Sequence, residues 1–421
     1  MSPKIAPSLI PAPVILKGVA MNYEWGGKRF IPDLVGLPNS ERLPFAEYWM
    51  GAHPSGPAEI LDLDLTLSDF IARDPRAILG EQTFREFGGL PYLFKVLDAE
   101  KMLSIQAHPS AEQAKLGFAR ENALGISLSA RNRNYKDTFP KPEIHVALTD
   151  FWMLHGFKPF AEIQKLFLSH PLFKGLKGTQ NFQSLPSSDE ASRRKSLRGI
   201  FGFLMNLEKG EVNRTIGAEL KRLANSPGGF SKAQAEYWVA KAGENFVLPS
   251  GDQDRGIFLI YLLNLLALKP GQATFQDSGV LHAYLEGSTM ELMANSDNVL
   301  RGGLTPKHVD VPELMATLTF ASGAPSRIEG TAKSITESVY VTPAREFEIS
   351  RIEIGAARKH RSEASSSAHT LIVLEGQVTL RSGETEKRLK RGEVAFVPAI
   401  CAYTLESEAP AAVYKASVPK I

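Results

Sequence analysis

The chain has 421 residues, of which 43% are hydrophobic and 22% charged, and these values are ordinary for a globular protein of two or three domains. Its 48 basic residues nearly balance 46 acidic ones, and the net charge of +2 argues against a nucleic-acid or membrane-surface role. The single cysteine, Cys401, excludes an internal disulfide and a cysteine-rich zinc site. The proline-broken stretch at 9–16 does not resemble a secretory signal, and the longest apolar run, from Gly256, is too short to span a bilayer. We therefore expect a cytoplasmic protein.

The first 60 residues hold short apolar segments broken by proline and glycine, a pattern typical of short strands joined by loops. The next segment, 65–81, predicts the first helix. Thr66 or Ser68 can cap this helix, and Gly80 stands near its end.

Residues 91–110 (PYLFKVLDAEKMLSIQAHPS) predict two apolar strands around a polar turn. Gln106 and His108 are two positions apart in the second strand, so their side chains point to the same face. A lone histidine in a strand is more often structural than a ligand, but a Gln-x-His pair that ends at Pro109 puts two polar groups among apolar neighbours. This pair is therefore a candidate for part of a metal site.

Residues 141–157 (KPEIHVALTDFWMLHGF) carry Glu143 and His145 in alternation along an apolar strand. Burying an unpaired carboxylate is very costly, so Glu143 must be ion-paired, protonated or bound to a metal. Glu143 thus joins the candidate metal ligands.

From Phe160 to about Ala267 the apolar residues recur at three- and four-residue spacing, which predicts helices. The last of these helices is expected over DRGIFLIYLLNLLAL, and QSLPSSDEASRRKS (183–196) is expected to be a surface linker. Its basic run, 193–195, is most simply a solvated helix start. The block predicts a helical insertion between two halves of a β domain.

The stretch 271–310 combines a glycine-spaced pattern with a polar run. Gly271, Gly279, His282 and Glu286 indicate two strands joined by a tight turn, and such a turn can present a metal ligand at the mouth of a β-barrel. The polar run that follows is one that a buried core would not choose, and it comprises Asn295, Ser296, Asp297, Asn298 and Arg301.

Gln106, His108, Glu143 and His282 together form a candidate set of imidazole, carboxylate and amide ligands. This set suits zinc, or another divalent first-row metal, with one coordination position left open. One carboxylate leaves the ion with a net charge of about +1, so it remains an electrophile.

The last ninety residues are alternating strands, and they contain an internal repeat. The segment 391–406 (RGEVAFVPAICAYTLE) matches 270–286 (PGQATFQDSGVLHAYLE), with Gly392 over Gly271. Cys401 stands where His282 does, so the chain is expected to contain two related barrels of which only the first keeps its ligand.

Several motifs resemble one known family. The glycine, histidine and glutamate spacing of 271–286 is similar to the second motif of cupin barrels, with Asp277 where proline is usual. AEYWMGAHPSG, SIQAHPS, KPE and HAYLEG…SDNVLRGGLTPKHVDV resemble the type I mannose-6-phosphate isomerases, over the whole chain and in order.

The resemblance implies a fold that is mainly β with a helical insertion: two cupin-type barrels, of the double-stranded β-helix or jelly-roll kind, plus an all-α domain. The catalytic cupin would comprise 1–155 and 255–325, with the helical insertion at 156–254 between them. Residues 326–421 would form a C-terminal cupin-like domain without metal ligands.

The resemblance also assigns site residues position by position. The four metal-ligand candidates match the family's zinc ligands, and one Zn²⁺ per chain is implied: Gln106, His108, Glu143 and His282. Three further polar residues match catalytic positions, namely Arg301, Asp297 and Lys141. Three resemble groups that bind the substrate and its phosphate, namely Ser104, Lys95 and Lys307.

One departure from the family concerns the proton carrier. The family commonly has histidine directly before Lys-Pro-Glu, and here that residue is Pro140. A scheme that uses this histidine as the base does not apply unchanged. Either His145 or Asp297 substitutes for it, or the histidine was never essential.

The activity that the resemblance implies is zinc-dependent interconversion of mannose 6-phosphate and fructose 6-phosphate through a cis-enediol, within carbohydrate metabolism towards GDP-mannose. Two alternatives are another cupin metalloenzyme, such as an iron-dependent dioxygenase, and a non-catalytic sugar-phosphate-binding protein. The expected partner is a small sugar phosphate, with no nucleic acid and no membrane, and we expect a monomer. No nucleotide-binding loop is apparent, so a fused guanylyltransferase is not expected.

Overall fold

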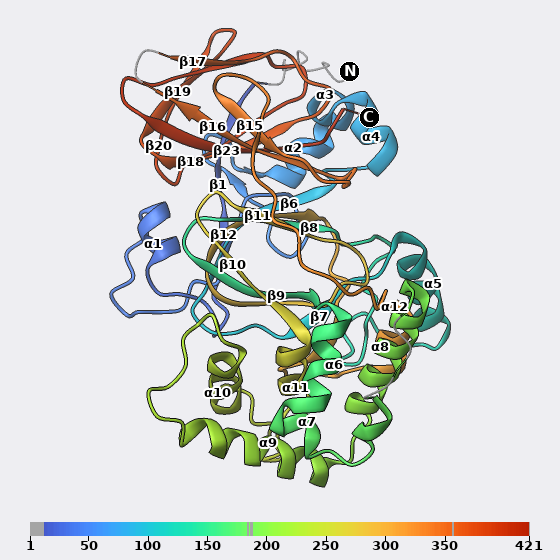
Figure 1. Cartoon of the computed structure of the whole chain (residues 1–421). Coiled ribbons are helices and arrows are strands. Elements are labelled where there is room, and N and C mark those ends of the chain that lie inside the picture. Colours follow the sequence, from blue (N-terminus) through green and yellow to red (C-terminus); the bar gives the residue numbers. More distant parts are fainter. Residues whose placement is uncertain (1–11, 183–184, 186–187, 356–357, 421) are drawn as a thin grey trace. The chain divides into compact units, whose positions relative to one another are not determined.

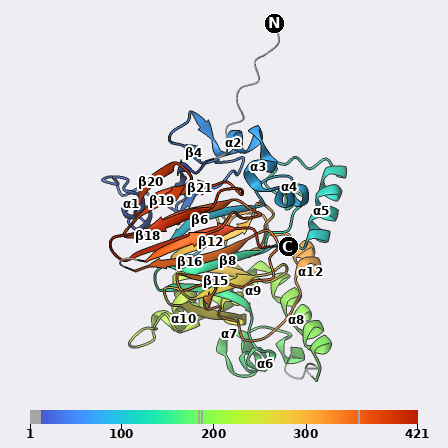
Figure 2. The same ribbon diagram turned by 90° about the horizontal axis from the view of Figure 1, so that it is seen from above.

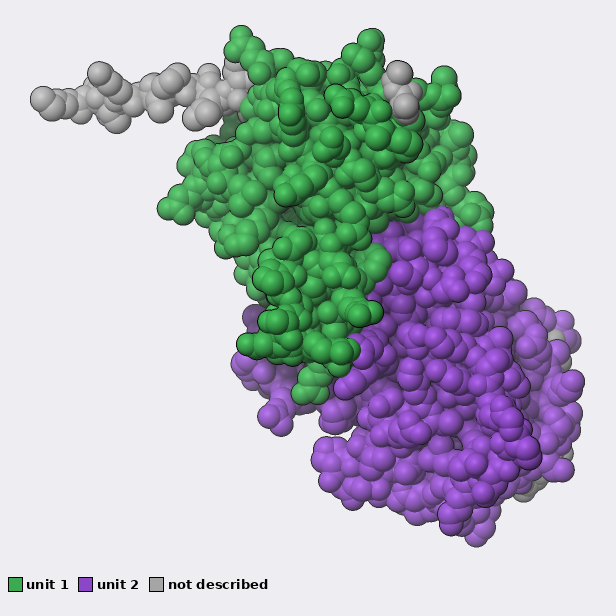
Figure 3. All heavy atoms as spheres, turned by 90° about the vertical axis from the view of Figure 1, so that its left-hand side faces the viewer, with its two compact units in different colours: residues 1–97, 290–295, 328–421 green, residues 98–289, 296–327 purple. Residues whose placement is uncertain are grey.

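The computed structural model describes residues 12–182, 185, 188–355 and 358–420. Within these residues the chain is mainly β, with twelve α-helices (Figure 1). The contacts divide it into two compact units (Figure 3). Unit 1 comprises residues 1–97, 290–295 and 328–421, and unit 2 comprises 98–289 and 296–327. The domain layout expected from the sequence stays a prediction.

Unit 1 is built on a nine-stranded antiparallel sheet in which the first described strand joins the C-terminal segment. Val14 pairs with Phe396, and Leu16 pairs with Val394. Figure 2 shows β15, β16 and β18 of this sheet, with β23 between β16 and β18 in the strand order. The sheet order is β14 (Thr331–Ala332), β15 (Glu337–Tyr340), β16 (Glu348–Ile354), β23 (Ala411–Ser417), β18 (His369–Glu375), β21 (Val394–Val397), β1 (Val14–Lys17), β4 (Glu59–Ile60) and β5 (Leu65–Thr66).

A four-stranded antiparallel sheet covers the first through a shared apolar core. Leu371 and Val413 of the larger sheet pack in one cluster with Val378, Leu380 and Leu405 of the smaller one. Val378 and Leu380 alternate with more exposed residues along their strand, as expected for two stacked sheets. The smaller sheet runs in the order β17 (Lys359–Ser362), β22 (Tyr403–Glu406), β19 (Gln377–Ser382) and β20 (Thr385–Lys390).

Apart from residues 290–294 of the strand His282–Ala294 (β12), the remaining elements of unit 1 come from the N-terminal segment. Strand β3 pairs antiparallel with both β2 and β6. These strands and the helices of the segment are β2 (Val19–Met21), β3 (Glu47–Trp49), β6 (Tyr92–Ala99, of which 92–97 lie in unit 1), α1 (Phe30–Val35), α2 (Leu67–Arg73), α3 (Pro75–Leu79) and α4 (Glu81–Phe87).

The single helix expected over 65–81 is wrong, because the segment forms two short helices. Thr66 caps α2 through a capping box with Asp69, so one of the two expected caps is confirmed. The helix then ends at Asp74, because Pro75 has no N–H to donate and its ring clashes with a preceding helical turn. Asp74 begins α3 by accepting a hydrogen bond from the Ala77 N–H.

Unit 2 holds the strands that carry most of the candidate site residues. Strand β12 pairs antiparallel with β7 and β9, β11 pairs with β8, and β13 pairs with β7. The strands are β7 (Ile105–Ala107), β8 (Glu143–Ala147), β9 (Phe151–Phe157), β10 (Leu263–Leu268), β11 (Ala273–Gln276), β12 (His282–Ala294, of which 282–289 lie in unit 2) and β13 (Leu300–Gly303).

Most helices of unit 2 gather at one end of the unit (Figure 1). Their apolar faces share a core that includes Phe167, Phe201, Ile216 and Trp238. The helices are α5 (Ala111–Ala123), α6 (Phe160–Ser169), α7 (Pro171–Lys174), α8 (Glu190–Met205), α9 (Lys209–Ala224), α10 (Ala235–Asn245), α11 (Gly256–Leu262) and α12 (Val311–Thr317), with a 3₁₀ turn at Thr179–Phe182.

The helix expected over DRGIFLIYLLNLLAL is wrong in its second half. Helix α11 ends at Leu262, and the chain continues as strand β10. Asn264 explains the change, because the two N–H groups of its amide are shared among four backbone carbonyls, those of His155, Gly156, Phe157 and Gly323. An apolar run that is buried on all sides has no periodicity to distinguish a helix from a strand.

The linker expected at 183–196 is also partly helical. Residues 183, 184, 186 and 187 lie outside the described part of the chain. From Glu190 onward the segment belongs to α8, which begins at Asp189 with a side-chain cap to the Ser192 N–H. The basic run at 193–195 therefore lies at the start of a helix, as expected. No helix in the described ranges has the length and apolarity needed to cross a membrane.

Candidate metal centre

Three of the four predicted ligands meet in the interior of unit 2. One ligand atom from each of His108, Glu143 and His282 lies within 4.8 Å of the others. His108 Nε2 is 3.3 Å from Glu143 Oε1, and His282 Nε2 is 3.5 Å from Glu143 Oε2. All three side chains are almost completely buried.

The fourth predicted ligand, Gln106, lies next to this cluster in the strand ladder. It pairs directly with His282 on one side and with Arg301 on the other. Side chains of directly paired residues share a face and stand about 5 Å apart at Cβ. Within the described residues the side-chain amide of Gln106 makes no hydrogen bond.

The two imidazoles are oriented by backbone carbonyls. His108 Nδ1 donates to the Asn298 carbonyl at 2.7 Å, and His282 Nδ1 donates to the Val280 carbonyl at 3.0 Å. A carbonyl only accepts, so each ring carries a proton on Nδ1 and turns its Nε2 towards Glu143. Both Nε2 atoms are buried without a hydrogen-bond partner among the described residues. Burial lowers the pKa of His282 to about 3, which keeps this ring neutral.

Glu143 is the charged member of the cluster. Burial raises its pKa, but His108 and Lys141 outweigh that effect and hold the pKa well below its usual range. Lys141 Nζ lies 3.3 Å from Glu143 Oε1. A carboxylate beside two imidazole Nε2 atoms that have no hydrogen-bond partner among the described residues is a set of ligands for a divalent cation.

Tyr284 is a site residue that sequence reasoning missed. Its hydroxyl donates to Glu143 Oε2 at 2.6 Å and lies 2.6 Å from His145 Nε2. The available signal was position, because Tyr284 follows His282 by two residues in a strand and therefore shares its face.

Arg301 and Lys307 are two neighbouring cations of the site. Arg301 is partly buried, its guanidinium makes no hydrogen bond or ion pair within the described ranges, and burial lowers its pKa. Burial and the nearby Arg301 lower the pKa of Lys307. Among the described residues neither cation has a carboxylate partner, and two such neighbouring cations favour an anion.

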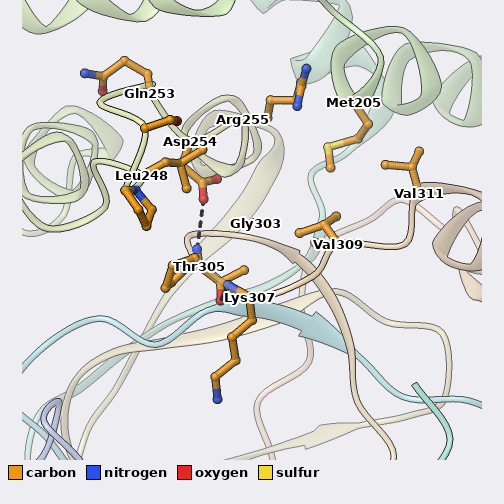
Figure 4. A pocket seen from close by; sticks show the side chains of 14 residues that line it. Met205, Leu248, Gln253, Asp254, Arg255, Gly303, Thr305, Lys307, Val309 and Val311 are labelled. Carbon is orange, nitrogen blue, oxygen red and sulfur yellow. Dashed lines mark hydrogen bonds between the residues drawn. The ribbon is translucent and has the colours of Figure 1, made fainter. Parts of the chain in front are cut away.

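Lys307 also lines a pocket of about 410 Å³, which is shown in Figure 4. Asp254 lies on its wall and accepts hydrogen bonds from the backbone N–H groups of Leu304 and Thr305, both at 2.9 Å. The Lys307 side chain extends away from Asp254 (Figure 4). Asp254 thus holds the loop that joins Arg301 to Lys307.

Hydrogen bonds from Ser296 and Asn298 hold a second loop, residues 136–139, close to His108. Asn298 Oδ1 accepts from the Lys136 N–H at 2.6 Å, and Asn298 Nδ2 donates to the Phe139 carbonyl at 2.8 Å. Ser296 Oγ donates to Asp137 Oδ1 at 2.9 Å. Because the Asn298 carbonyl orients His108, this network connects the loop before Lys141 to the metal ligands.

The other predicted site residues lie in different settings. Asp297 is exposed, and its backbone N–H donates to Asp137 Oδ2. Ser104 is partly buried and directly precedes β7. Lys95 belongs to unit 1, where its Nζ is ion-paired with Glu47 at 3.1 Å and Glu291 at 2.8 Å. Pro140 supplies no titratable group.

Comparisons with known proteins point to one family. The model of the phosphomannose isomerase type I catalytic domain matches residues 14–160. Mannose-6-phosphate isomerase of Salmonella typhimurium is 38% identical over 382 residues, covering 90% of this chain and 93% of that protein. Mannose-6-phosphate isomerase of Homo sapiens is 35% identical over 416 residues, covering 94% of each.

Solved structures agree with the sequence comparisons. The crystal structure of the apo form of mannose 6-phosphate isomerase from Salmonella typhimurium is similar with a TM-score of 0.86 at 34% identity, covering 98% of this chain and 100% of that chain. A zinc-bound crystal structure of mannose 6-phosphate isomerase is similar with the same TM-score, 0.86, and the same identity, 34%.

Proposed function

The chain belongs to the type I mannose-6-phosphate isomerase family, and from this premise we propose that it interconverts mannose 6-phosphate and fructose 6-phosphate with zinc. The observation that carries the proposal is the buried cluster of His108, Glu143 and His282, with both histidine Nε2 atoms orphaned beside one carboxylate. Solved relatives with bound zinc support the choice of metal.

The residues of the cluster fit one zinc ion per chain. His108, Glu143 and His282 supply two nitrogens and an oxygen, and Gln106 adds its amide oxygen from the neighbouring strand. When bound, zinc polarises the carbonyl and hydroxyl oxygens of the sugar and stabilises the charge that develops on them. Lys141 compensates the charge of Glu143 through its contact with Oε1.

Isomerisation moves the C2 hydrogen of the aldose to C1 through a cis-enediol, so a base must remove a proton and return it. His145 is one candidate base, and its Nε2 contacts the Tyr284 hydroxyl, which also contacts Glu143. Asp297 is the alternative base, and its exposure suits exchange of the proton with solvent. Pro140 removes the position that the family commonly uses.

Arg301 stabilises the negative charge of the enediolate, because its guanidinium is partly buried and has no partner among the described residues. Lys307 and Ser104 bind the phosphate, which anchors the far end of the sugar and fixes its orientation. Lys95 is assigned to substrate binding by the resemblance, and within unit 1 it is ion-paired with Glu47 and Glu291.

Under this assignment the residues 1–155 and 255–325 form the catalytic cupin, 156–254 the helical insertion and 326–421 the C-terminal cupin-like domain. The internal repeat and the two facing sheets around Leu380 support this layout. A crystal structure with one barrel around Glu143 and another around Leu380 tests it, and a single continuous barrel would contradict it. The chain is assigned as a monomer, which sedimentation equilibrium tests.

The test of function is conversion of mannose 6-phosphate to fructose 6-phosphate before chelation, after chelation and after zinc is added back. We expect activity that disappears with the chelator and returns with zinc. Binding of the sugar phosphate without turnover would instead identify a sensor. Oxygen consumption restored by iron would identify a dioxygenase. No observation on the site favours either alternative.

A further inference from the structure

Gln276 is a buried amide that none of the roles above uses. It is the last residue of β11, its side chain is 0% exposed, and neither Oε1 nor Nε2 has a hydrogen-bond partner among the described residues. Leaving both ends of a buried amide unpaired is costly, so such groups are rare unless they serve a ligand or a water molecule.

The register of β11 places this amide beside the metal centre. Gln276 pairs directly with Glu143 in the antiparallel ladder between β11 and β8. Side chains of directly paired residues lie on the same face, about 5 Å apart at Cβ. Because the carboxylate of Glu143 faces His108 and His282, the Gln276 side chain lies on the same face of the strands as the metal-ligand cluster.

The burial pattern of β11 agrees with the Gln276 side chain lying on the inner face of the sheet. Thr274 and Gln276 are fully buried, whereas Phe275 between them is only partly buried. Thr274 shares the face of Gln276, but its hydroxyl has a partner, since it donates to the Ser326 carbonyl at 3.3 Å. Gln276 has the same orientation without such a partner.

We propose that Gln276 is a further positioning residue of this site, and that its amide binds a hydroxyl group held beside Glu143. The hydroxyl belongs to a water molecule in the resting enzyme and to the sugar in the complex. An amide suits both, because Oε1 accepts and Nε2 donates a hydrogen bond. The part of the inference that concerns the sugar hydroxyl, its sugar arm, rests on the proposed isomerase function. The part that concerns the water molecule, its water arm, rests on the metal cluster alone.

The test replaces the amide with apolar side chains of similar size, in the variants Gln276→Leu and Gln276→Met. Thr215→Val is the matched control, because Thr215 is also buried in unit 2 with an unpartnered hydroxyl, but it lies in helix α9, which carries no site residue. Zinc affinity is measured by competition with a chelating dye, and kcat and KM are measured at saturating zinc. Urea unfolding shows whether each variant folds.

We expect both Gln276 variants to fold, and the urea unfolding curve checks this. We expect zinc affinity or kcat/KM to fall about tenfold, which is the usual effect of removing a residue that supports metal ligands. Loss of zinc affinity identifies the water arm, and loss of kcat/KM at unchanged zinc affinity identifies the sugar arm. Thr215→Val should change neither quantity.

The inference is overturned if both Gln276 variants keep zinc affinity and kcat/KM within about twofold of the wild type. A wild-type protein that does not convert mannose 6-phosphate would refute the isomerase function instead. In that case the zinc competition of the Gln276 variants alone decides the inference.

Discussion

At the scale of single residues, Tyr284 links the groups around Glu143, because one hydroxyl contacts both Glu143 Oε2 and His145 Nε2. We expect Tyr284→Phe to lower kcat/KM or zinc affinity about tenfold or more, since a hydrogen bond to a charged group contributes roughly 1.5–3 kcal/mol. Steady-state kinetics and dye competition measure both effects.

The control for this substitution is Tyr261→Phe. Tyr261 is another buried tyrosine, and it donates to Glu219 Oε1 at the same distance, 2.6 Å, in the helical part of unit 2. Tyr261→Phe should lower the free energy of unfolding but leave kcat/KM unchanged. Equal kinetic losses in the two variants would show that Tyr284 acts only through stability.

Arg301 separates two kinds of catalytic contribution. Because its guanidinium has no partner within the described residues, we expect Arg301→Ala to leave the urea midpoint unchanged or raised. Loss of a group that stabilises developing charge lowers kcat about 100-fold. Arg301→Lys should recover part of this rate. A variant that raises KM alone would place Arg301 on the phosphate and contradict the enediolate role.

Sequence reasoning found residues whose types are unusual for their surroundings. His108, Glu143 and His282 are polar groups in apolar strands, and the structure brings them together. It missed Tyr284 and Gln276, because a tyrosine fits an apolar core and a strand-end glutamine fits a turn. Their proximity to Glu143 comes from strand register, which a single sequence does not state.

At the scale of elements, the loop after β13 depends on a close approach to the start of α11. A Cβ added at Gly303 would lie 2.5 Å from Gly256 Cα, and Gly303 has a φ of 146°. We expect Gly303→Ala to destabilise unit 2 and to lower kcat/KM, because the loop carries Lys307 away from its position. Urea unfolding and kinetics measure the two effects.

Gly251→Ala is the control for this substitution, because Gly251 also has a positive φ, 80°, but nothing lies within 4 Å of an added Cβ. Gly251→Ala should lower the free energy of unfolding only because alanine disfavours a positive φ, by about 1–2 kcal/mol. We expect Gly303→Ala to exceed that cost by about 1 kcal/mol or more. Equal losses of unfolding free energy in the two variants would show that the backbone near Gly256 moves to accept the added Cβ without strain.

The boundaries of elements were the least predictable part of the fold. Thr66 was visible as a cap, but the break before Pro75 was overlooked within a helical pattern. The end of α11 depends on hydrogen bonds from Asn264 to distant carbonyls such as that of Gly323. Tertiary contacts of this kind override a local pattern, and no local signal announces them.

At the scale of the whole molecule, unit 1 contains a buried polar cluster that should make stability depend on pH. Burial lowers the pKa of His360 to about 4 and that of His369 to about 3. Glu337, Lys415 and Lys333 are the charged groups that act on these rings, and the Tyr403 hydroxyl contacts His369 Nδ1 at 3.1 Å. Both rings are therefore neutral in the folded chain near pH 7.

The unfolded chain binds protons on these histidines below a pKa of about 6.5, whereas the folded chain does not until about pH 4. The free energy of unfolding should therefore fall as pH decreases from about 6.5 to about 4, by about 1.4 kcal/mol per pH unit for each histidine. Urea midpoints between pH 7 and pH 4.5 measure this slope. His360→Gln with His369→Gln should make it shallower, and an unchanged slope would contradict the assignment.

The most direct measurement of the central claim is a titration of the metal-free protein with zinc while conversion of mannose 6-phosphate is followed. The cluster of His108, Glu143 and His282 predicts activity that rises linearly and stops rising at one zinc equivalent per chain. Activity that is present without zinc, or that stays absent after one equivalent is bound to the folded protein, would contradict a zinc-dependent isomerase.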